Sequence, residues 1–289
     1  MNYLLHILIM INIYAILVFS LNLLVGYGGL LSLAHAAFYG IGAYGTTLLM
    51  MGIGVNFFPA LVAGILMSSF FALFIAYPSL RLKGDYFILA SLGFQIIVFA
   101  VLYNWIGLTR GPYGIPGIPR PRLFSLEIDS LPEFFIFTGV IFLLVFFFIR
   151  ILCRSPFGRA LKAIREDEMT ASALGKNIPS LKIWAFVISA GVAAISGALY
   201  AGYVTYIDPT SFTLDESIFI LSILLVGGSG NIKGPLVGAV FMIILPEALR
   251  FLGLPDTIAP NVRQMIYGFL LVILMRYRPQ GLAGEYRFE

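Results

Sequence analysis

The sequence is poor in charged residues, and this excludes a water-soluble globular domain. Only 11% of its 289 residues are Asp, Glu, Lys or Arg, whereas 60% are apolar. Ordinary soluble domains contain roughly 25% charged and roughly 45–50% apolar residues. The chain therefore has too few polar side chains to cover a folded surface in water, and its mean hydropathy of +0.97 indicates lipid as the solvent. The composition predicts a polytopic membrane protein.

Cysteine and histidine are nearly absent, which excludes two kinds of site. The single cysteine, Cys153, cannot form an intrachain disulfide, and with His6 and His35 it gives no ligand spacing of a zinc site. The glycines and serine at 227–230 fit the pattern around an intramembrane serine nucleophile, but both histidines precede them and no later residue can act as the base. We expect no metal site and no catalytic residue.

The chain also lacks a nucleotide-binding motif. No G-x-x-x-x-G-K-[ST] occurs, and a match to the dinucleotide fingerprint at 40–45 lies in an apolar run without a strand before it. The 18 basic residues against 14 acidic ones do not indicate nucleic-acid binding, because they form short clusters between apolar runs. We expect no cofactor bound by this chain, and any ATP hydrolysis must come from a partner.

Long apolar runs are what the sequence has in abundance. A membrane-spanning helix needs about 20 apolar residues. Eight runs qualify: 4–25, 28–51, 56–80, 84–106, 133–152, 182–206, 234–252 and 262–278. A further run, within 217–230, is too short to cross and ends in glycines, which indicates a re-entrant or broken segment buried in protein or lining a polar cavity. The predicted fold is an all-α polytopic membrane protein with about eight transmembrane helices plus that segment, forming one domain over 1–289.

Basic residues predict the orientation, because Lys and Arg are retained on the cytoplasmic side. Three basic clusters lie between or after the spans, at 81–83, 150–182 and 276–287. We expect all three to be cytoplasmic, together with the C-terminus. This puts a long outer loop, 107–132, and the segment 207–216 outside. Simple alternation puts the N-terminus outside too, but a broken helix within 26–51 would reverse it.

Small residues recur every four positions in two predicted spans. One ridge consists of Ser32, Ala36 and Gly40, and the other of Ser189, Ala193, Gly197 and Ala201. In lipid, where apolar burial gives helices little reason to associate, such ridges allow close backbone approach. We expect tight helix packing at both ridges, with the lining of a path as the less favoured alternative.

Polar side chains inside the predicted spans mark a substrate route or an interhelical hydrogen bond, because such groups are costly in hydrocarbon. Both interpretations stay open. The glycine-rich end of the short run joins them, since irregular backbone at membrane depth lines polar cavities. The candidates for a translocation path are Asn22, Ser32, His35, Gln95, Gly227, Gly228 and Ser229.

The stretch 155–175 is the most informative polar segment. Ser155 can cap a helix, Pro156 suits its first turn, and Gly175 suits a left-handed end, so one bounded helical segment is predicted. It has an apolar face and a dense polar face, which suits a partner's groove or the surface of anionic lipid. The acidic run 166–168 favours a protein partner, because anionic lipid would repel it.

Several motifs along nearly the whole chain resemble those of one family, in the same order. They lie at 21–38, 40–44, 81–87, 109–115, 155–160 and 227–235. Together they resemble the branched-chain amino acid ABC transporter permeases of the LivM type. The resemblance implies a permease subunit in a bacterial cytoplasmic (inner) membrane, moving branched-chain or related hydrophobic amino acids inward. Urea or short amides are an alternative substrate class.

The resemblance also implies partners. These are two ABC ATPase subunits that use ATP and Mg²⁺, an extracytoplasmic substrate-binding protein, and a homologous second permease (LivH-like) or a second copy of this chain, all assembled in or on the lipid bilayer. A self-sufficient secondary transporter is the alternative within transport. It needs intramembrane carboxylates and an internal repeat, but Asp85, Glu216 and Glu247 lie near span ends and no convincing repeat is present.

By the same likeness, 155–175 is a coupling helix in a cytoplasmic loop, 153–181, which transmits closure of the ATPases to the membrane spans. Arg159, Glu166 and Gly175 match the coupling-loop pattern of the family. The residues assigned to ATPase coupling are Pro156, Phe157, Gly158, Arg159, Ala160, Ile164, Arg165, Glu166, Asp167 and Gly175.

Overall fold

Helices make up nearly all of the described chain. The computed structural model describes residues 2–79, 85–123, 126–250 and short stretches within 262–284. The helices are α1 (Asn2–Asn22), α2 (His35–Gly52), α3 (Phe57–Ser79), α4 (Asp85–Asn104), α5 (Ile106–Thr109), α6 (Leu131–Arg154), α7 (Pro156–Glu166), α8 (Glu168–Ala173), α9 (Ile178–Val204), α10 (Leu214–Gly227) and α11 (Lys233–Arg250). The π-helix η1 (Leu23–Tyr27) continues α1, and two 3-10 turns are η2 (Gly111–Tyr113) and η3 (Pro209–Phe212).

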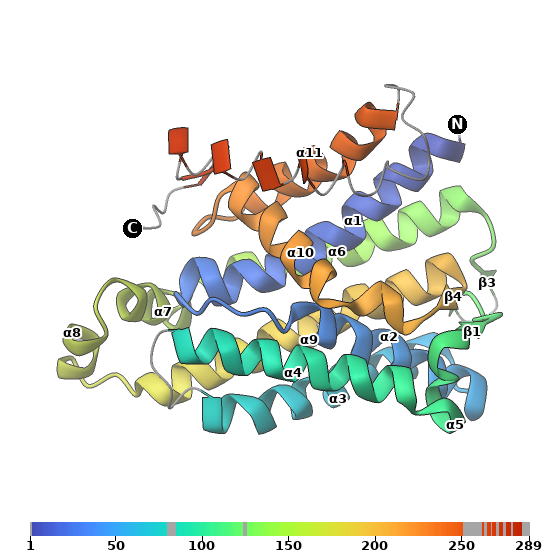
Figure 1. Cartoon of the computed structure of the whole chain (residues 1–289), viewed down its shortest axis with the longest axis horizontal. Coiled ribbons are helices and arrows are strands. Elements are labelled where there is room, and N and C mark those ends of the chain that lie inside the picture. Colours follow the sequence, from blue (N-terminus) through green and yellow to red (C-terminus); the bar gives the residue numbers. More distant parts are fainter. Residues whose placement is uncertain are drawn as a thin grey trace.

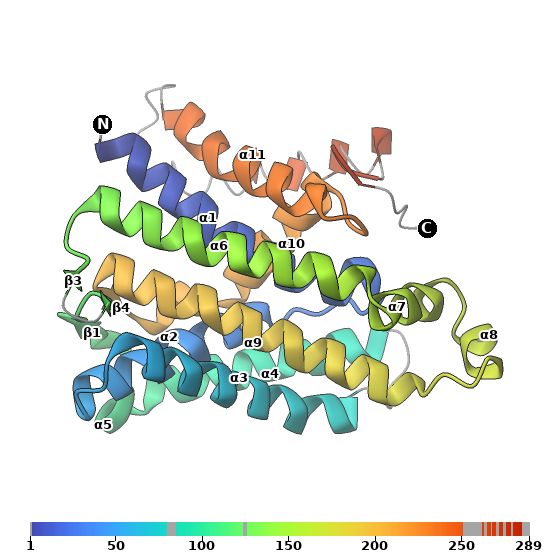
Figure 2. The same cartoon turned by 180° about the vertical axis from the view of Figure 1, so that it is seen from behind.

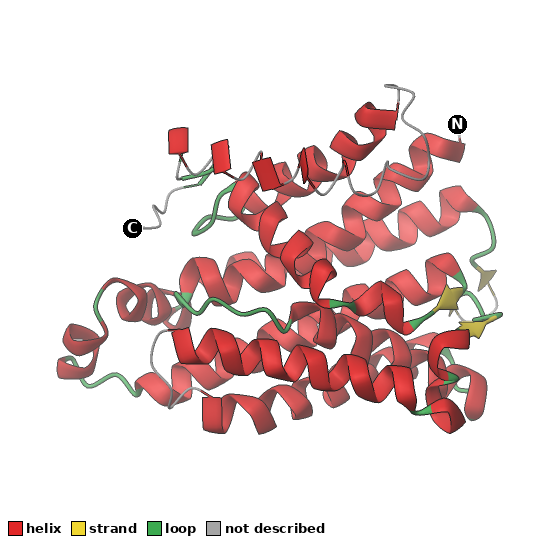
Figure 3. Cartoon of the chain, viewed as in Figure 1, coloured by secondary structure: helices red, strands yellow, loops and turns green. Residues whose placement is uncertain are grey.

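Four short strands are confined to one end of the helical bundle (Figure 3). They are β1 (Ile115–Pro116), β2 (Arg122–Leu123), β3 (Leu126–Glu127) and β4 (Tyr206–Ile207). The strand β1 pairs antiparallel with β4, which sets Ile115 opposite Ile207. This pairing brings the predicted outer loop, 107–132, against the segment 207–216, so the two lie at one end as the orientation argument requires.

Five helical segments in the described part are long and apolar enough to cross a membrane. They are Asn2–Tyr27, Phe57–Ser79, Tyr86–Asn104, Leu131–Arg154 and Ile178–Val204. Each coincides with a predicted span, so the all-α polytopic membrane architecture is confirmed. A count of eight is not confirmed. Neither α2 nor α11 meets both conditions of length and apolarity, and the predicted span 262–278 is described only in short stretches, with 263–264, 267, 270–271 and 274–275 outside the described residues.

The predicted span 28–51 is wrong as a continuous helix. Residues 28–34 are not helical, and α2 begins only at His35. Gly29 has a φ of +66°, which favours glycine and ends the helix before it. The short segment predicted within 217–230 is α10, a helix of 14 residues, so its shortness is confirmed. In Figure 1, α2 and α10 both begin near the middle of the bundle and run towards opposite ends.

The two ends of the bundle carry different structures. Figures 1 and 2 show α7 and α8 projecting from one end, where the last described residues also lie, and α5 with the strands at the other. The N-terminus lies at the strand end, as simple alternation predicts. The break at 28–34 does not reverse it, because the chain returns only halfway there and α2 then runs back towards the end at which α1 begins. The basic cluster at 81–83 is outside the described residues.

The centre of the bundle is the contact between α2 and α9. A Cβ atom on Gly197 would lie 2.0 Å from the backbone oxygen of Tyr39, and one on Gly42 would lie 2.4 Å from Cα of Ala194. Such close approach lets backbones pack by van der Waals contact in lipid. The predicted packing of the α9 ridge is confirmed. On α2 it is Gly42 that meets α9, whereas Gly40 faces the ring of Phe212.

Candidate functional site

A buried polar cluster surrounds the first turn of α2. The N–H of Ala36 donates to Oγ of Ser217 (3.0 Å), and the N–H of Ala37 donates to Oε1 of Gln95 (2.6 Å). Nε2 of Gln95 donates to the backbone oxygen of Phe212 (2.8 Å), and the Ser217 hydroxyl donates to Oε1 of Gln95 (3.2 Å). One amide from α4 therefore connects the start of α2 to the segment that leads into α10. These bonds satisfy backbone groups that irregular structure would leave bare in a membrane.

His35 lies beside this cluster with one ring nitrogen unused. Its Nε2 is 3.0 Å from Oγ of Ser189, whose hydroxyl donates to the backbone oxygen of Ser20 (2.6 Å). Because a hydroxyl carries a single proton, Nε2 of His35 is the donor to Ser189. Nδ1 is buried and has no hydrogen-bond partner among the described residues.

The residues predicted for a translocation path fall into two groups. Ser32, His35 and Gln95 lie around the start of α2, where Oγ of Ser32 accepts from the N–H of Ala34 (3.3 Å). The second group, Asn22 with 227–229, lies where α1 meets the turn between α10 and α11. The structure thus brings together three of the predicted polar residues near the middle of the bundle and puts the others nearer the α7 end.

The backbone of the turn at 227–230 packs tightly against Asn22 of α1 and against residues 282–284. Oδ1 of Asn22 accepts from the N–H of Gly230 (3.1 Å), and its Nδ2 donates to the backbone oxygen of Asn231 (2.7 Å). Leu282 and Ala283 donate their N–H groups to the backbone oxygens of Val226 and Gly227, at 2.8 and 2.9 Å. A Cβ atom on Gly228, whose φ is +99°, would lie 2.2 Å from the nitrogen of Gly284. Only glycine fits this position.

The prediction of one helix over 155–175 is wrong, because α7 ends at Glu166 and α8 begins at Glu168. The predicted ends are confirmed: Oγ of Ser155 accepts from the N–H of Gly158 (3.5 Å), and Gly175 has a φ of +75°. Gly158 also allows α7 to fold against the end of α6, since a Cβ there would lie 2.3 Å from the backbone oxygen of Cys153.

The break lies at Asp167, which caps the new helix. Its Oδ1 accepts from the N–H groups of Met169 (2.9 Å) and Thr170 (3.3 Å), as an N-cap does. The Thr170 hydroxyl and these two N–H groups hold the pKa of Asp167 below its usual range, so the cap is ionised at neutral pH. The acidic run at 166–168 therefore contains a local structural signal.

The two helices present a mixed surface away from the bundle. Four residues of α7 are fully buried against the bundle and are small or apolar, and the side chain of Arg165 is buried beside them; the four are Gly158, Ala160, Leu161 and Ile164. Arg159 and Glu166 are exposed on α7. Beyond them, the side chains of Met169 and Leu174 are 83% and 72% exposed. Figure 2 shows that α8 extends past the ends of the membrane helices, so this apolar surface lies outside the bundle.

Arg165 connects α7 to the membrane helices. Its side chain is buried, pairs with Glu166 (2.5 Å), and donates from Nη1 to the backbone oxygen of Gly26 in η1. A Cβ atom on Gly29 would lie 2.8 Å from Cγ of Arg165. On its other side, Gly26 packs against the 227–230 turn, because a Cβ there would lie 2.6 Å from the nitrogen of Gly230. One contact path therefore runs from α7 through η1 to the start of α11.

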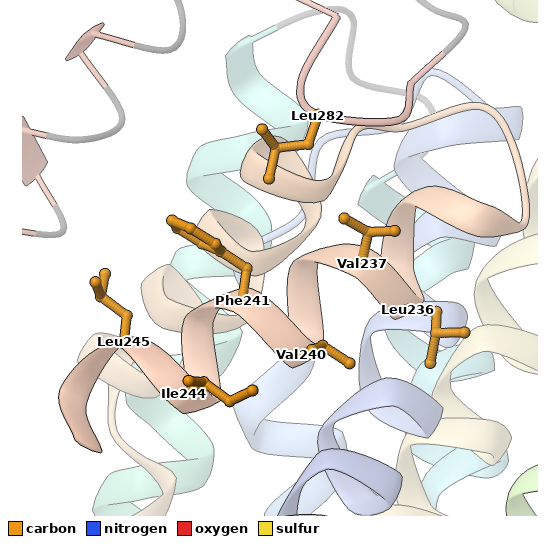
Figure 4. A pocket seen from close by; sticks show the side chains of 7 residues that line it. All are labelled: Leu236, Val237, Val240, Phe241, Ile244, Leu245 and Leu282. Carbon is orange, nitrogen blue, oxygen red and sulfur yellow. The ribbon is translucent and has the colours of Figure 1, made fainter. Parts of the chain in front are cut away.

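An apolar groove runs along the outer face of α11 (Figure 4). Its volume is about 580 Å³. It is lined by Leu236, Val237, Val240, Phe241, Ile244, Leu245 and Leu282. An exposed apolar face of this kind suits lipid or another membrane helix, and it offers no polar group to fix the orientation of a small solute. Among the described residues, no group of three or more His, Cys, Asp or Glu is placed to hold a metal ion.

Three residues that make polar contacts inside the bundle are not among the site residues predicted from the sequence. Ser189 counted only as a small packing residue, and Ser217 only as part of an apolar run. Glu216, predicted to lie outside the membrane, is on the first turn of α10 and accepts a hydrogen bond from the hydroxyl of Tyr14 (2.7 Å). Hydroxyls in an apolar run are a usable signal, since in lipid they bond across helices.

Gln95→Leu is expected to destabilise the protein by about 2 kcal/mol or more, because each buried polar group left without a partner costs about 1–3 kcal/mol. The groups left are the hydroxyl of Ser217 and the backbone oxygen of Phe212, whereas the N–H of Ala37 still donates to the backbone oxygen of Ala34 (3.1 Å). Thermal unfolding of the purified protein in detergent measures the effect. Asn104→Leu is the control, since Asn104 is exposed on the same helix and donates only to Ala100 (2.8 Å). Equal unfolding temperatures for the two variants would contradict the prediction.

Comparison with known proteins identifies relatives over nearly the whole chain. The family model described as "Branched-chain amino acid transport system / permease component" matches residues 3–275. The chain is 37% identical over 296 residues to the high-affinity branched-chain amino acid transport system permease protein LivM of Salmonella typhimurium, covering 94% of this chain and 68% of that protein. It is 31% identical over 293 residues to a probable LivM of Methanocaldococcus jannaschii, covering 92% and 84%. It is also 27% identical over 299 residues to LivH of Escherichia coli, covering 96% and 92%. No solved structure matches the chain.

Proposed function

Because the chain belongs to the family of permease components of branched-chain amino acid transport systems, we propose that it is the membrane-spanning subunit of an ATP-driven importer in a bacterial inner membrane. It moves branched-chain or related hydrophobic amino acids inward. Its relatives are named for that transport, which does not favour urea, short amides or a self-sufficient secondary transporter. The chain itself is a transporter subunit and not an enzyme.

The observation that carries the proposal is the α7–α8 projection. It joins charged residues with exposed apolar ones, Met169 and Leu174, beyond the membrane helices, and a surface of this composition suits a protein partner. The sequence has no P-loop. We assign the projection to docking of two ATPase subunits that use ATP and Mg²⁺. This orientation makes the α7 end and the C-terminus cytoplasmic.

The remaining partners follow from the same orientation. The strand end, with loop 107–132, faces an extracytoplasmic substrate-binding protein. The second permease is a LivH-like homologue or a second copy of this chain, and the apolar face of α11 is available to it or to lipid. Both LivM and LivH relatives are named as permease proteins of branched-chain amino acid transport systems, which supports a permease partner.

The contacts of Arg165 connect movement of α7 to the membrane helices. ATP-driven movement of α7 passes through Arg165 to the backbone of Gly26, and from η1 to the turn at 227–230. That turn is the end of α10, and the start of α10 lies at the polar cluster around Gln95. The ATPases thereby change the relative populations of inward-open and outward-open states.

Copurification from the native membrane tests the assembly. The tagged chain is expected to recover ATPase subunits and a second permease, identified by mass spectrometry. Arg159→Glu, which reverses an exposed charge on α7, is expected to lose the ATPases and keep the permease. Arg110→Glu makes the same charge change on an exposed residue at the strand end and should keep both the ATPases and the second permease. A lone homo-oligomer whose uptake does not depend on ATP would contradict the importer, whereas full ATPase recovery with Arg159→Glu would contradict only the docking site.

A further inference from the structure

A carboxylate lies within the bundle, and no basic side chain among the described residues pairs with it. Glu216 is partly buried on the first turn of α10 and accepts from the hydroxyl of Tyr14 (2.7 Å). None of the ion pairs between described residues includes Glu216. Taking an ionised carboxylate out of water is costly unless an opposite charge and further hydrogen bonds compensate it. One phenol hydroxyl is not an opposite charge, so the site is suited to an incoming cation.

Aromatic rings form the wall next to this carboxylate. The ring of Tyr39 lies 5.5 Å from that of Tyr200 and 5.1 Å from that of Phe212, measured between centroids. Tyr14 meets Phe219 edge-on at 5.6 Å. The start of α2 is held against this part of α10, because the N–H of Ala36 donates to Oγ of Ser217 (3.0 Å), the residue after Glu216, and Tyr39 follows three positions later in α2. The faces of such rings attract cations, most strongly Trp and Tyr.

The hydroxyl of Tyr39 forms no hydrogen bond with any described residue. The side chain of Tyr39 is 1% exposed. A buried hydroxyl without a partner costs about 1–3 kcal/mol, so native proteins rarely retain one without a function. The hydroxyl of Tyr44, which lies on the same helix and whose ring is 5.9 Å from that of Phe212, is also buried without a partner in this part of the chain.

A second carboxylate lies close by in the chain. Asp208 is the N-cap of η3, whose Phe212 ring packs against Tyr39 and Tyr44. Its carboxylate is already used locally, since it accepts from the hydroxyls of Thr210 (2.7 Å) and Ser211 (2.7 Å). The segment 208–216 therefore carries two carboxylates beside these rings, and negative charge of this kind favours positive ligands.

We propose that Glu216, with the hydroxyls of Tyr14 and Tyr39, binds the primary ammonium group of the transported amino acid as it passes through the membrane. The inference rests on the proposed function and names the part of the substrate that this region recognises. An ammonium group has three N–H donors: the carboxylate accepts one, the phenol oxygens accept the others, and the rings of Tyr39 and Tyr200 contribute cation–π attraction. Asp215, next in sequence, is exposed, so the start of α10 is reachable from the surface of the chain.

Uptake by the assembled transporter tests the site. The complex with its ATPases and second permease is reconstituted in proteoliposomes with the binding protein outside, and ATP-driven uptake of radiolabelled leucine is measured beside ATP hydrolysis. Glu216→Gln keeps the shape and removes the charge, and it is expected to lower uptake about 10-fold or more, since a hydrogen bond to a charged group is worth about 1.5–3 kcal/mol. Asp215→Asn is the matched control, expected within about 2-fold of the parent because its exposed carboxylate is screened by water.

Tyr39→Phe separates binding from folding. It removes an oxygen that has no protein partner, so a structural function predicts unchanged or higher thermal stability and unchanged uptake. The binding function predicts unchanged stability and uptake reduced several-fold. Leucine uptake at the parent rate in both Glu216→Gln and Tyr39→Phe overturns the inference and leaves the importer intact. No ATP-driven leucine uptake by the parent complex overturns the proposed function instead.

Discussion

Gly197→Val is expected to abolish accumulation of the folded protein. The valine Cβ would lie 2.0 Å from the backbone oxygen of Tyr39 and 2.8 Å from the nitrogen of Ala43, and neither atom belongs to a side chain that can rotate away. The helices α2 and α9 must therefore separate at the centre of the bundle. Overpacking of this kind costs about 3 kcal/mol or more when backbone must move. The fraction of monodisperse protein after size-exclusion chromatography in detergent measures it.

Gly93→Val supplies the control for that experiment. Gly93 lies within α4, and a Cβ atom on it meets nothing within 4 Å. The two variants therefore share the change in composition and the helical context but differ in the space available to the side chain. If Gly197→Val yields as much monodisperse protein as Gly93→Val, the α2–α9 contact does not determine the fold.

Arg165→Ala is expected to uncouple ATP hydrolysis from transport. Removing the guanidinium deletes the contact between α7 and the backbone of Gly26, while the exposed face of α7 and α8 stays intact. We expect leucine uptake by the reconstituted complex to fall about 10-fold or more, the change that losing a charged hydrogen bond of about 1.5–3 kcal/mol produces. ATP hydrolysis and copurification of the ATPases should continue.

Arg154→Ala is the matched control, because Arg154 is exposed in the last turn of α6. Parent-like uptake by Arg165→Ala would show that force does not pass through Gly26. Loss of the ATPases from Arg165→Ala would make Arg165 a docking residue instead. The three outcomes are distinguished by measuring uptake, hydrolysis and composition on the same preparation.

Helix positions could be predicted where the signal is local. A run of about 20 apolar residues is a property of the run itself, and the spans that became α1, α3, α4, α6 and α9 were found in this way. The start of α2 was not found. Its N–H groups are satisfied by Ser217 and Gln95, which are 181 and 58 positions away from their partners, and hydropathy carries no information on such distant contacts.

The break at Asp167 has a local signal, because aspartate is a favoured N-cap residue and its carboxylate accepts from the N–H of Thr170 three residues later. The acidic run 166–168 also favours a protein partner over anionic lipid, and that interpretation gives no reason for a helix to end there. Glu216 is the opposite case. Beside Asp215 it looks like part of an exposed segment, and only the approach of α1, which carries Tyr14, encloses it. Polar residues within apolar runs, such as Gln95, were the reliable guide to the interior.

The hydrogen bonds of Gln95 have a kinetic consequence. One amide bonds the N–H of Ala37 in α2, the hydroxyl of Ser217 in α10 and the backbone oxygen of Phe212 between them, so neither Ser217 nor Phe212 can move away alone without leaving a bare polar group in a dry interior. A partial rearrangement of these hydrogen bonds therefore costs more free energy than a complete one. This agrees with the discrete alternative arrangements that packed protein interiors adopt. In the proposed transport cycle we therefore expect the start of α10 to cross a single barrier between two end states, with intermediate openings, through which solute would leak, sparsely populated.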